Sequence, residues 1–181
     1  MVIRSRVAKR YALALFEAAL AAQKLEVVES DIHLIEQEYR QIAALRKLID
    51  SPVVSNAVKR SVVTELFRDR VDAITFEMLI LLIEKNRENY LPGVITYFRE
   101  LLDEHRGILR ADLYSVIPLS ESQRRNLKKR LDALTGKNVI LTQHIDPSLL
   151  GGFRIRIKDT VFDSSLKHQL EKLRESLVRA S

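Results

Sequence analysis

Apolar residues recur every three or four positions through the first 105 residues, which is the pattern of amphipathic helices. Pro52 and Gly107 interrupt this pattern, because proline cannot continue a helix and glycine commonly ends one. Ser55 or Asn56 is placed to cap the helix that follows Pro52. The links between the periodic segments are short, as in a bundle. The predicted helices span about residues 3–22, 27–48, 56–67, 72–87 and 92–105.

After Gly107 the period changes from helical to alternating. Strands are predicted at about 109–117, 139–145 and 153–157, and Ser120 with Gln123 forms a capping-box pattern that opens a helix between the first two. A final helix follows the cap at 163–165, and its apolar stripe is Leu166, Leu170, Leu173 and Leu177. The order β-α-β-β-α predicts a small α/β domain. The fold class is therefore mainly α with a small α/β part, divided into domains at 1–106 and 107–181.

Charge separates the same two parts of the chain. Residues 1–105 contain 15 Lys and Arg against 16 Asp and Glu, whereas residues 106–181 contain 15 against 8. The whole net charge of +6 therefore comes from the second part. Such a bias suits nucleic acid, anionic lipid or an acidic protein, and charge alone does not choose among them.

No catalytic or metal-binding constellation emerges, so we predict no enzyme activity and no cofactor. The chain has no cysteine, and no two of its four histidines have the i, i+4 spacing of a helical metal site. Thr135-Gly136-Lys137 lacks the first glycine of a phosphate loop, because residue 131 is Leu. Gly151-Gly152 lacks the flanking glycines of a dinucleotide fingerprint.

The amino-terminal segment superficially resembles a secretory signal, since basic residues precede an alanine-rich stretch. Glu17 interrupts that stretch and the helical period continues through it, so we favour a helix of the folded protein over a removable segment. The longest fully apolar run, Met78 to Ile83, is far shorter than the roughly 20 residues of a membrane span. Membrane association is therefore expected only through a complex.

That apolar run covers every side of a helix and leaves no stripe for water. Two interpretations stay open: a central helix enclosed by its own bundle, or a helix with one face in the core and the other in the wall of a groove for a partner helix. The first predicted helix favours the groove, because its many alanines permit close approach by other helices.

The segment 124–130 places five basic residues on one predicted helix. A solvated helix face is the commoner outcome for such a pattern. If the segment binds anything, a phosphate or an acidic coiled coil fits. No aromatic residue lies within it, so base stacking is not supported and nucleic acid is not expected as a partner.

Several motifs follow one another over nearly the whole chain. They are Ala8-Lys9-Arg10-Tyr11-Ala12-Leu13-Ala14-Leu15-Phe16-Glu17, Leu48-Ile49-Asp50-Ser51-Pro52, Asn86-Arg87 with Leu91, Ile117-Pro118-Leu119-Ser120, and Ile145-Asp146-Pro147-Ser148-Leu149-Leu150-Gly151-Gly152-Phe153. In this order they resemble the delta subunits of ATP synthase, a family equivalent to the mitochondrial oligomycin-sensitivity-conferring protein. Leu150 stands where isoleucine is frequent in that family.

The resemblance implies a six-helix bundle, a smaller α/β domain, and a non-catalytic stator subunit that is monomeric within a hetero-oligomer. It implies that the first and fifth helices hold the amino-terminal helix of an alpha subunit, and that the α/β domain meets the carboxyl-terminal region of the b subunit. The groove residues would be Val7, Tyr11, Ala14, Ala18, Met78, Leu79 and Leu82. The b-subunit contacts would be Arg154, Arg156, Leu170, Leu173 and Leu177.

A rival interpretation is an RNA-binding helical-bundle factor of the antitermination kind. It accounts for the basic excess and the helices, but not for the appended α/β module. Its basic residues should also lie in the bundle, which is near neutral here. For a stator subunit the expected location is the cytoplasmic face of a bacterial cell membrane, with a plastid thylakoid as the less favoured alternative.

Overall fold

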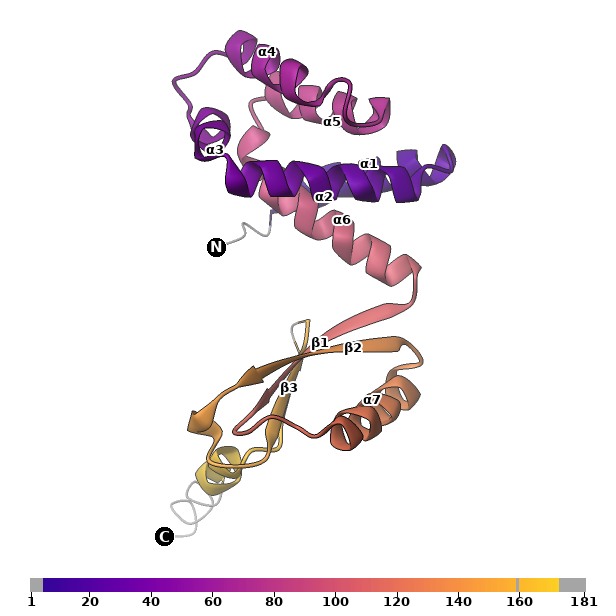
Figure 1. The fold of residues 1–181 in the computed structure, drawn as a ribbon, viewed down its shortest axis with the longest axis vertical. Coiled ribbons are helices and arrows are strands. Elements are labelled where there is room, and N and C mark those ends of the chain that lie inside the picture. Colours follow the sequence, from indigo (N-terminus) through magenta and orange to yellow (C-terminus); the bar gives the residue numbers. More distant parts are fainter. Residues whose placement is uncertain (1–4, 159, 173–181) are drawn as a thin grey trace. The chain divides into compact units, whose positions relative to one another are not determined.

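The computed structural model describes residues 5–158 and 160–172. Its contacts divide the chain into two compact units, residues 1–102 and 103–181, which we call the helical unit and the α/β unit. The predicted division after residue 106 falls a few residues later, just beyond His105, where the last helix before the sheet ends. Figure 1 shows helices in the first unit and a sheet with a flanking helix in the second.

The first part of the chain is helical, as its apolar period predicts. Serine and aspartate side chains cap three of the helices: Ser5 accepts from the amide of Val7, Ser55 from Val58, and Asp72 from Ile74. The elements are α1 (Arg6–Ala21), α2 (Leu25–Gln41), α3 (Ala43–Asp50), α4 (Asn56–Phe67), α5 (Ala73–Glu84), the 3-10 turn η1 (Glu88–Tyr90) and α6 (Leu91–His105).

The prediction of one helix over 27–48 is wrong, because the chain bends at Ile42 and forms two helices there. Ile42 has an extended backbone, with φ −94° and ψ 94°. It is both the C-cap residue of α2 and the N-cap residue of α3. No proline or glycine marks this position in the sequence. The bend turns Leu45 and Ile49 into the core, so packing rather than local propensity sets it.

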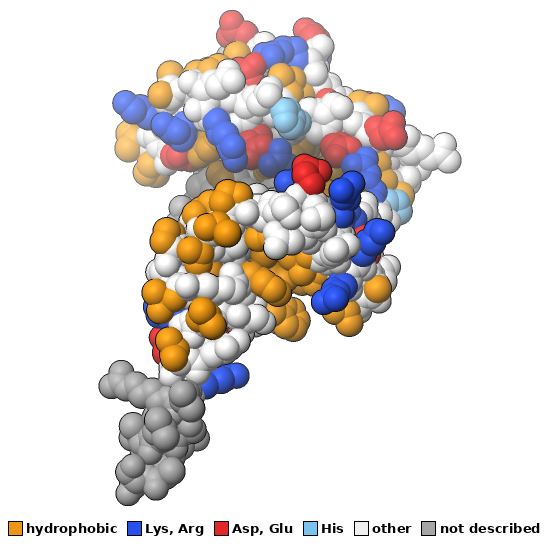
Figure 2. Space-filling model, turned by 60° about the horizontal axis from the view of Figure 1, so that its bottom comes forward, with side chains coloured by type: hydrophobic (Ala, Val, Ile, Leu, Met, Phe, Trp, Pro, Cys, Tyr) orange, Lys and Arg blue, Asp and Glu red, His pale blue; other side chains and the backbone are white. Residues whose placement is uncertain are grey.

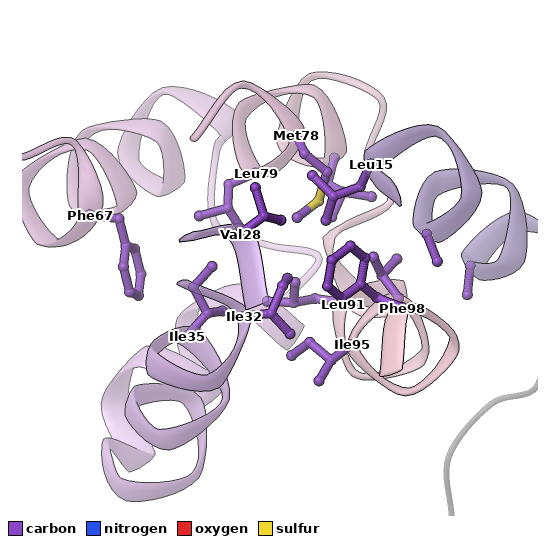
Figure 3. Close-up of a cluster of buried hydrophobic side chains, with 14 of the residues drawn as sticks. Leu15, Val28, Ile32, Ile35, Phe67, Met78, Leu79, Leu91, Ile95 and Phe98 are labelled. Atoms are coloured by element: carbon purple, nitrogen blue, oxygen red, sulfur yellow. The ribbon is translucent and has the colours of Figure 1, made fainter. Parts of the chain in front are cut away.

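The core of the helical unit lies among α1, α2, α4, α5 and α6 (Figure 3). Leu15 from α1 and Met78 from α5 lie close together in it, with Phe98 of α6 on the same side. Small side chains on the inner face of α1 let the neighbouring helices approach: Ala8, Ala12 and Ala19 are fully buried. The other large contributors are Val28, Ile32, Ile35, Phe67, Leu79, Leu82, Leu91 and Ile95.

Two charged side chains inside this unit fasten helices to one another. Asp31 of α2 is buried and accepts hydrogen bonds from the amide of Asp72 (2.9 Å) and the hydroxyl of Thr75 (2.8 Å), at the start of α5. Lys59 of α4 is only 2% exposed and donates to the carbonyl of Ile49 (3.2 Å) and to the carboxylate of Glu88. Both groups satisfy the requirement that a buried charge has a partner.

The α/β unit contains a four-stranded sheet in the order β2-β1-β3-β4, with α7 on one side of it (Figure 1). The strands β1 and β2 are parallel and joined through α7, while β3 and β4 are antiparallel to their neighbours. The elements are β1 (Ile108–Ser115), α7 (Glu121–Thr135), β2 (Asn138–Ile145), the 3-10 turn η2 (Pro147–Leu149), β3 (Phe153–Ile157) and β4 (Thr160–Asp163), and residues 166–172 are helical up to the last described residue.

Local signals set the ends of α7. The predicted capping box is present, with Ser120 accepting from the amide of Gln123 and Gln123 accepting from that of Ser120. Gly136 ends the helix in the left-handed conformation, at φ 66°. Leu127 and Leu131 then pack on the inner face of the sheet, against Leu113 and its neighbours.

The predicted order β-α-β-β-α omits β4, and this is a correction. The strand has only four residues, and two of its apolar side chains, Val161 and Phe162, are exposed. The segment forms a strand because its backbone pairs with β3, where Ile155 stands opposite Phe162. A segment this short carries too few positions to show alternation by itself.

We expect Lys59→Ala to destabilise the helical unit by about 3–5 kcal/mol, because it leaves the Glu88 carboxylate, which is largely buried, without its cation. Thermal or urea unfolding of the full chain measures the loss. Arg60→Ala is the matched control: the neighbouring Arg60 pairs with Glu84 at an exposed site, so its loss should cost at most about 1 kcal/mol. Equal losses in the two variants would contradict the assigned role of Lys59.

Alkaline stability should depend on Tyr39, whose hydroxyl donates to both oxygens of Asp50 (3.0 and 3.1 Å) across the bend at Ile42. Burial, together with this bond to a carboxylate, raises the pKa of Tyr39 to about 12. The folded chain therefore holds this proton more tightly than the unfolded chain, and the associated stability is lost as pH rises from about 10 to 12.

Replacing Tyr39 with Phe removes that titration. In urea unfolding at a series of pH values, the free energy of unfolding should fall more steeply above pH ~10 for the parent than for Tyr39→Phe. Other alkaline titrations are common to both proteins and cancel in the comparison. Parallel curves would show that Tyr39 titrates alike in the folded and unfolded chain.

Candidate functional site

The described residues contain no cluster of three or more His, Cys, Asp or Glu side chains placed to hold a metal ion. No helix in the same described part has both the length and the hydropathy to cross a lipid bilayer. The residues predicted to bind other chains fall on both units.

The outward side of α1 presents a flank of small and apolar residues. Val7, Tyr11, Ala14 and Ala18 follow one another at helical spacing, beside the buried face of Ala8, Ala12, Leu15 and Ala19. Ala14 and Ala18 are exposed, while Val7 and Tyr11 are half-buried. Four of the predicted groove residues therefore share one accessible strip of surface, which we call the α1 flank.

The three predicted groove residues on α5 lie elsewhere. Met78, Leu79 and Leu82 are at most 7% exposed and belong to the core of the unit's own helices (Figure 3). In this conformation they are buried in the core and do not form an open wall. The apolar surface that α5 leaves accessible is at Leu81, which is exposed, and Ile74, which is half-buried. The six-residue apolar run does not show which side of α5 is buried and which is exposed, because it is apolar on every side.

Arg87, just beyond α5, holds Tyr11 in place. One guanidinium nitrogen donates to the Tyr11 hydroxyl (3.3 Å), and the guanidinium carbon lies 5.9 Å from the centre of the ring. A cation over a tyrosine ring adds to the hydrogen bond. The two residues are 76 positions apart, so no spacing in the sequence predicts the pair. It links the α1 flank to the end of α5.

In the α/β unit, the predicted docking residues Arg154 and Arg156 lie on the sheet face opposite α7, and both are engaged within the unit. Arg156 donates to Asp112 (2.9 Å), and Arg154 donates to Asp146 (3.2 Å) and lies over the ring of Tyr114. On the same face, the ring of His144 stacks on the ring of Tyr114. The Nε2 atom of His144 lies 2.9 Å from a carboxylate oxygen of Asp112.

These bonds hold the aspartates of that face ionised. The hydrogen bond with His144, followed by the one from Arg156, lowers the pKa of Asp112 below its ordinary value, against the opposing effect of burial. A hydrogen bond from Ser148 lowers the pKa of Asp146 in the same way. The arginines are therefore partners of internal carboxylates, and a visiting acidic group would have to displace those partners.

The remaining predicted docking residues are Leu170, Leu173 and Leu177. Leu170 is exposed within residues 166–172. Leu173 and Leu177 lie outside the described residues. Leu170 therefore lies on the surface of the α/β unit.

A pocket of about 650 Å³ opens between the first half of α7 and the ends of β1 and β3. Figure 2 shows hydrophobic side chains gathered on the surface of the α/β unit. The sequence did not predict this pocket, although about half of its lining residues belong to the two family motifs at 117–120 and 145–153. It is lined by Ser115, Val116, Ile117, Pro118, Leu119, Gln123, Asn126, Leu127, Arg130, Leu150, Gly151, Gly152 and Phe153.

Most of the basic segment 124–130 on α7 is exposed, and one of its basic residues, Lys128, has partners within the unit. Lys128 binds Asp132 (2.8 Å) and the side chain of Asn138 (2.7 Å). Within the part of the chain that the structure describes, Arg124, Arg125, Lys129 and Arg130 form no ion pair. They leave α7 with uncompensated positive charge, and Arg130 carries that charge to the pocket.

Comparison with known proteins identifies the family. The family model for the ATP synthase delta (OSCP) subunit matches residues 7–177. The ATP synthase subunit delta of Chlorobaculum tepidum is 38% identical over 170 residues, which is 94% of this chain and 94% of that one. The subunit delta of Chloroherpeton thalassium is 39% identical over 173 residues, 96% of this chain and 94% of the other.

A solved structure agrees with the sequence relatives. A chain in the structure of the Toxoplasma gondii mitochondrial ATP synthase hexamer superimposes with a TM-score of 0.72 at 25% identity, covering 96% of this chain and 98% of that chain. The RNA-binding alternative finds no support here, because these matches extend through both units, including the α/β unit that it left unexplained. The chain therefore belongs to the ATP synthase delta (OSCP) family, the non-catalytic peripheral-stalk subunits that link the catalytic head of the enzyme to its membrane sector and hold it against the torque of the rotor.

Proposed function

We propose that the helical unit binds the amino-terminal helix of an alpha subunit on the α1 flank. The observation that carries this proposal is the accessible strip of Val7, Tyr11, Ala14 and Ala18, which lies beside a core already filled by the unit's own side chains. Small residues on that strip allow a guest helix to approach the α1 backbone closely. Its Tyr11 is fixed by Arg87, so the strip is ordered before the guest arrives.

The accessible part of α5 completes this site in the proposal. Leu81 and Ile74 supply apolar surface, while Met78, Leu79 and Leu82 give the site a rigid floor. A guest with apolar residues at i, i+3, i+4 and i+7 matches such a surface. The six helices from α1 to α6 would act together as one bundle around α5, so that force on the guest passes into a single packed body.

The α/β unit, residues 107–181 of the predicted division, would bind the carboxyl-terminal region of the b subunit. Its excess of positive charge and the exposed Leu170 support this part of the proposal. The predicted contacts Leu173 and Leu177 lie outside the described residues. Arg154 and Arg156 would contribute less, because internal carboxylates occupy them.

The complex would lie at the cytoplasmic face of a bacterial cell membrane. The relatives reported above are bacterial, and their names place them in ATP synthases. In this arrangement the chain is one copy within a hetero-oligomer. Its function is an affinity and a stiffness, since a brace must stay bound to the head and the stalk for longer than one turnover of the rotor.

We expect Ala14→Asp and Ala18→Asp to weaken binding of a peptide with the amino-terminal sequence of the cognate alpha subunit. The parent chain should bind that peptide with a dissociation constant of about 1 nM or lower, corresponding to roughly −12 kcal/mol. A charge in the flank must be desolvated on binding, so each variant should lose affinity about 100-fold or more. Isothermal titration calorimetry of the full chain measures both constants.

The control for these variants is Ala133→Asp, an exposed alanine on α7 in the other unit, which should leave peptide affinity unchanged. Salt up to ~0.5 M should weaken the parent complex only slightly, because apolar burial dominates it. Leu79→Glu is unsuitable as a test, since Leu79 lies in the core and its loss reports on folding. If both flank variants kept parent affinity, the α1 flank would not be the binding site.

A further inference from the structure

The pocket beside α7 has a feature that folding alone does not require. Leu150, at its rim, is in the left-handed backbone region with φ 61° and ψ −20°, and its side chain is 65% exposed. Glycine and asparagine adopt this conformation more readily than leucine does. A large aliphatic side chain at this position therefore adds backbone strain without filling the unit's own core.

The apolar surface around the pocket extends onto the last described helix. Ile117, on the loop before α7, is 71% exposed and lines the pocket. Gly151 lines it too, and a Cβ atom at Gly151 would stand 2.6 Å from the Cδ1 atom of Leu166, so Leu166 packs directly on the pocket wall. Leu166 and Leu170 are both exposed and one helical turn apart. The pocket and this leucine stripe thus form one continuous apolar surface.

Positive charge borders the same surface. Arg130 lines the pocket, and within the described chain it has no acidic partner. The nearest carboxylate on its helix, Asp132, is held by Lys128 and by the amide of Val139. The charge of Arg130 is therefore available to a group that enters the pocket from outside.

We infer that this pocket is the seat of an amphipathic helix whose apolar stripe carries acidic residues along one edge. The apolar side chains would enter between Ile117, Leu127 and Leu150 and continue over Leu166, while a carboxylate at the edge pairs with Arg130. A volume of about 650 Å³ lies within the range of sites that enclose apolar ligand groups. The inference rests on the proposed docking of the stalk by the α/β unit, and it places that docking on the pocket.

The opposite sheet face fits this occupant less well. Its two arginines already have carboxylate partners in Asp112 and Asp146, and Arg154 also covers Tyr114. An acidic helix docking there would have to break satisfied pairs. At the pocket it meets exposed leucines and Arg130, which forms no ion pair with any described residue. Charge complementarity therefore favours the pocket.

The test uses the full chain and a synthetic peptide with the carboxyl-terminal sequence of the cognate b subunit, with binding followed by fluorescence anisotropy. Leu150→Asn should weaken the peptide about tenfold or more, while thermal stability stays equal or rises because asparagine relieves the left-handed strain. The matched control is Leu134→Asn, an exposed leucine on α7 outside the pocket lining, which should leave affinity unchanged.

A second pair of variants separates the charge from the apolar surface. Arg130→Glu should weaken the peptide several-fold, and the difference from the parent should shrink as salt is raised. Lys129→Glu makes the same change in net charge at the neighbouring residue, which does not line the pocket, so it should have little effect. Equal losses for the two variants would mean that only the general charge of α7 matters, which overturns the role of Arg130.

The outcomes distinguish the inference from the function on which it rests. If the parent chain does not bind the peptide, the proposed docking of the stalk by the α/β unit is wrong, and the pocket inference falls with it. If the parent binds and both Leu150→Asn and Arg130→Glu bind equally well, stalk docking stands and the pocket is not its seat. If the chain alone forms a dimer that Leu150→Asn dissociates, the pocket serves a second copy and the inferred occupant is wrong.

Discussion

The burial of one face of α5 governs the helical unit. Met78, Leu79, Leu82 and Ile83 lie on that face, so other helices must cover it. The alanines of α1 meet this requirement, because side chains as small as Ala8 and Ala12 let two helix backbones come close over Met78, Leu79 and Leu82. Once that face of α1 is committed to the core, the adjacent flank with Ala14 and Ala18 is what remains for a partner.

Polar interactions add rigidity to this packing at the points where helices begin and end. Asp31 holds the start of α5, Lys59 joins α4 to η1 and to the end of α3, and Arg87 fixes Tyr11. Except for the bond from Lys59 to Ile49, each of these bonds connects segments that are distant in sequence. A subunit that transmits force between the head and the stalk benefits from such fastenings, because they oppose sliding of helices that apolar contacts alone permit.

The two faces of the sheet in the α/β unit are covered in different ways. One face is closed by α7, and the other is covered by a network of Asp112, His144, Tyr114, Arg154 and Arg156 that satisfies its own charges. Exposed leucines and Arg130, which has no ion pair among the described residues, lie instead at the pocket beside α7. Groups that a fold leaves without partners are the ones available for binding another chain.

The sequence by itself determined the features that depend on neighbouring residues. Helical and alternating periods located most elements, Ser120 with Gln123 opened α7, and Gly136 closed it. The order of motifs along the chain also sufficed to indicate the family, since that order survives without any knowledge of contacts.

Tertiary structure decided whatever depends on residues far apart. The bend at Ile42 and the short strand β4 exist because packing and pairing favour them over local preference. The apolar run of α5 is equally hydrophobic on all sides, so only its neighbours determine that Leu79 is buried and Leu81 is not. In the same way, pairing with Asp112 and Asp146 engaged the predicted docking arginines, while Arg130, unremarkable within a basic run, was left open beside a pocket.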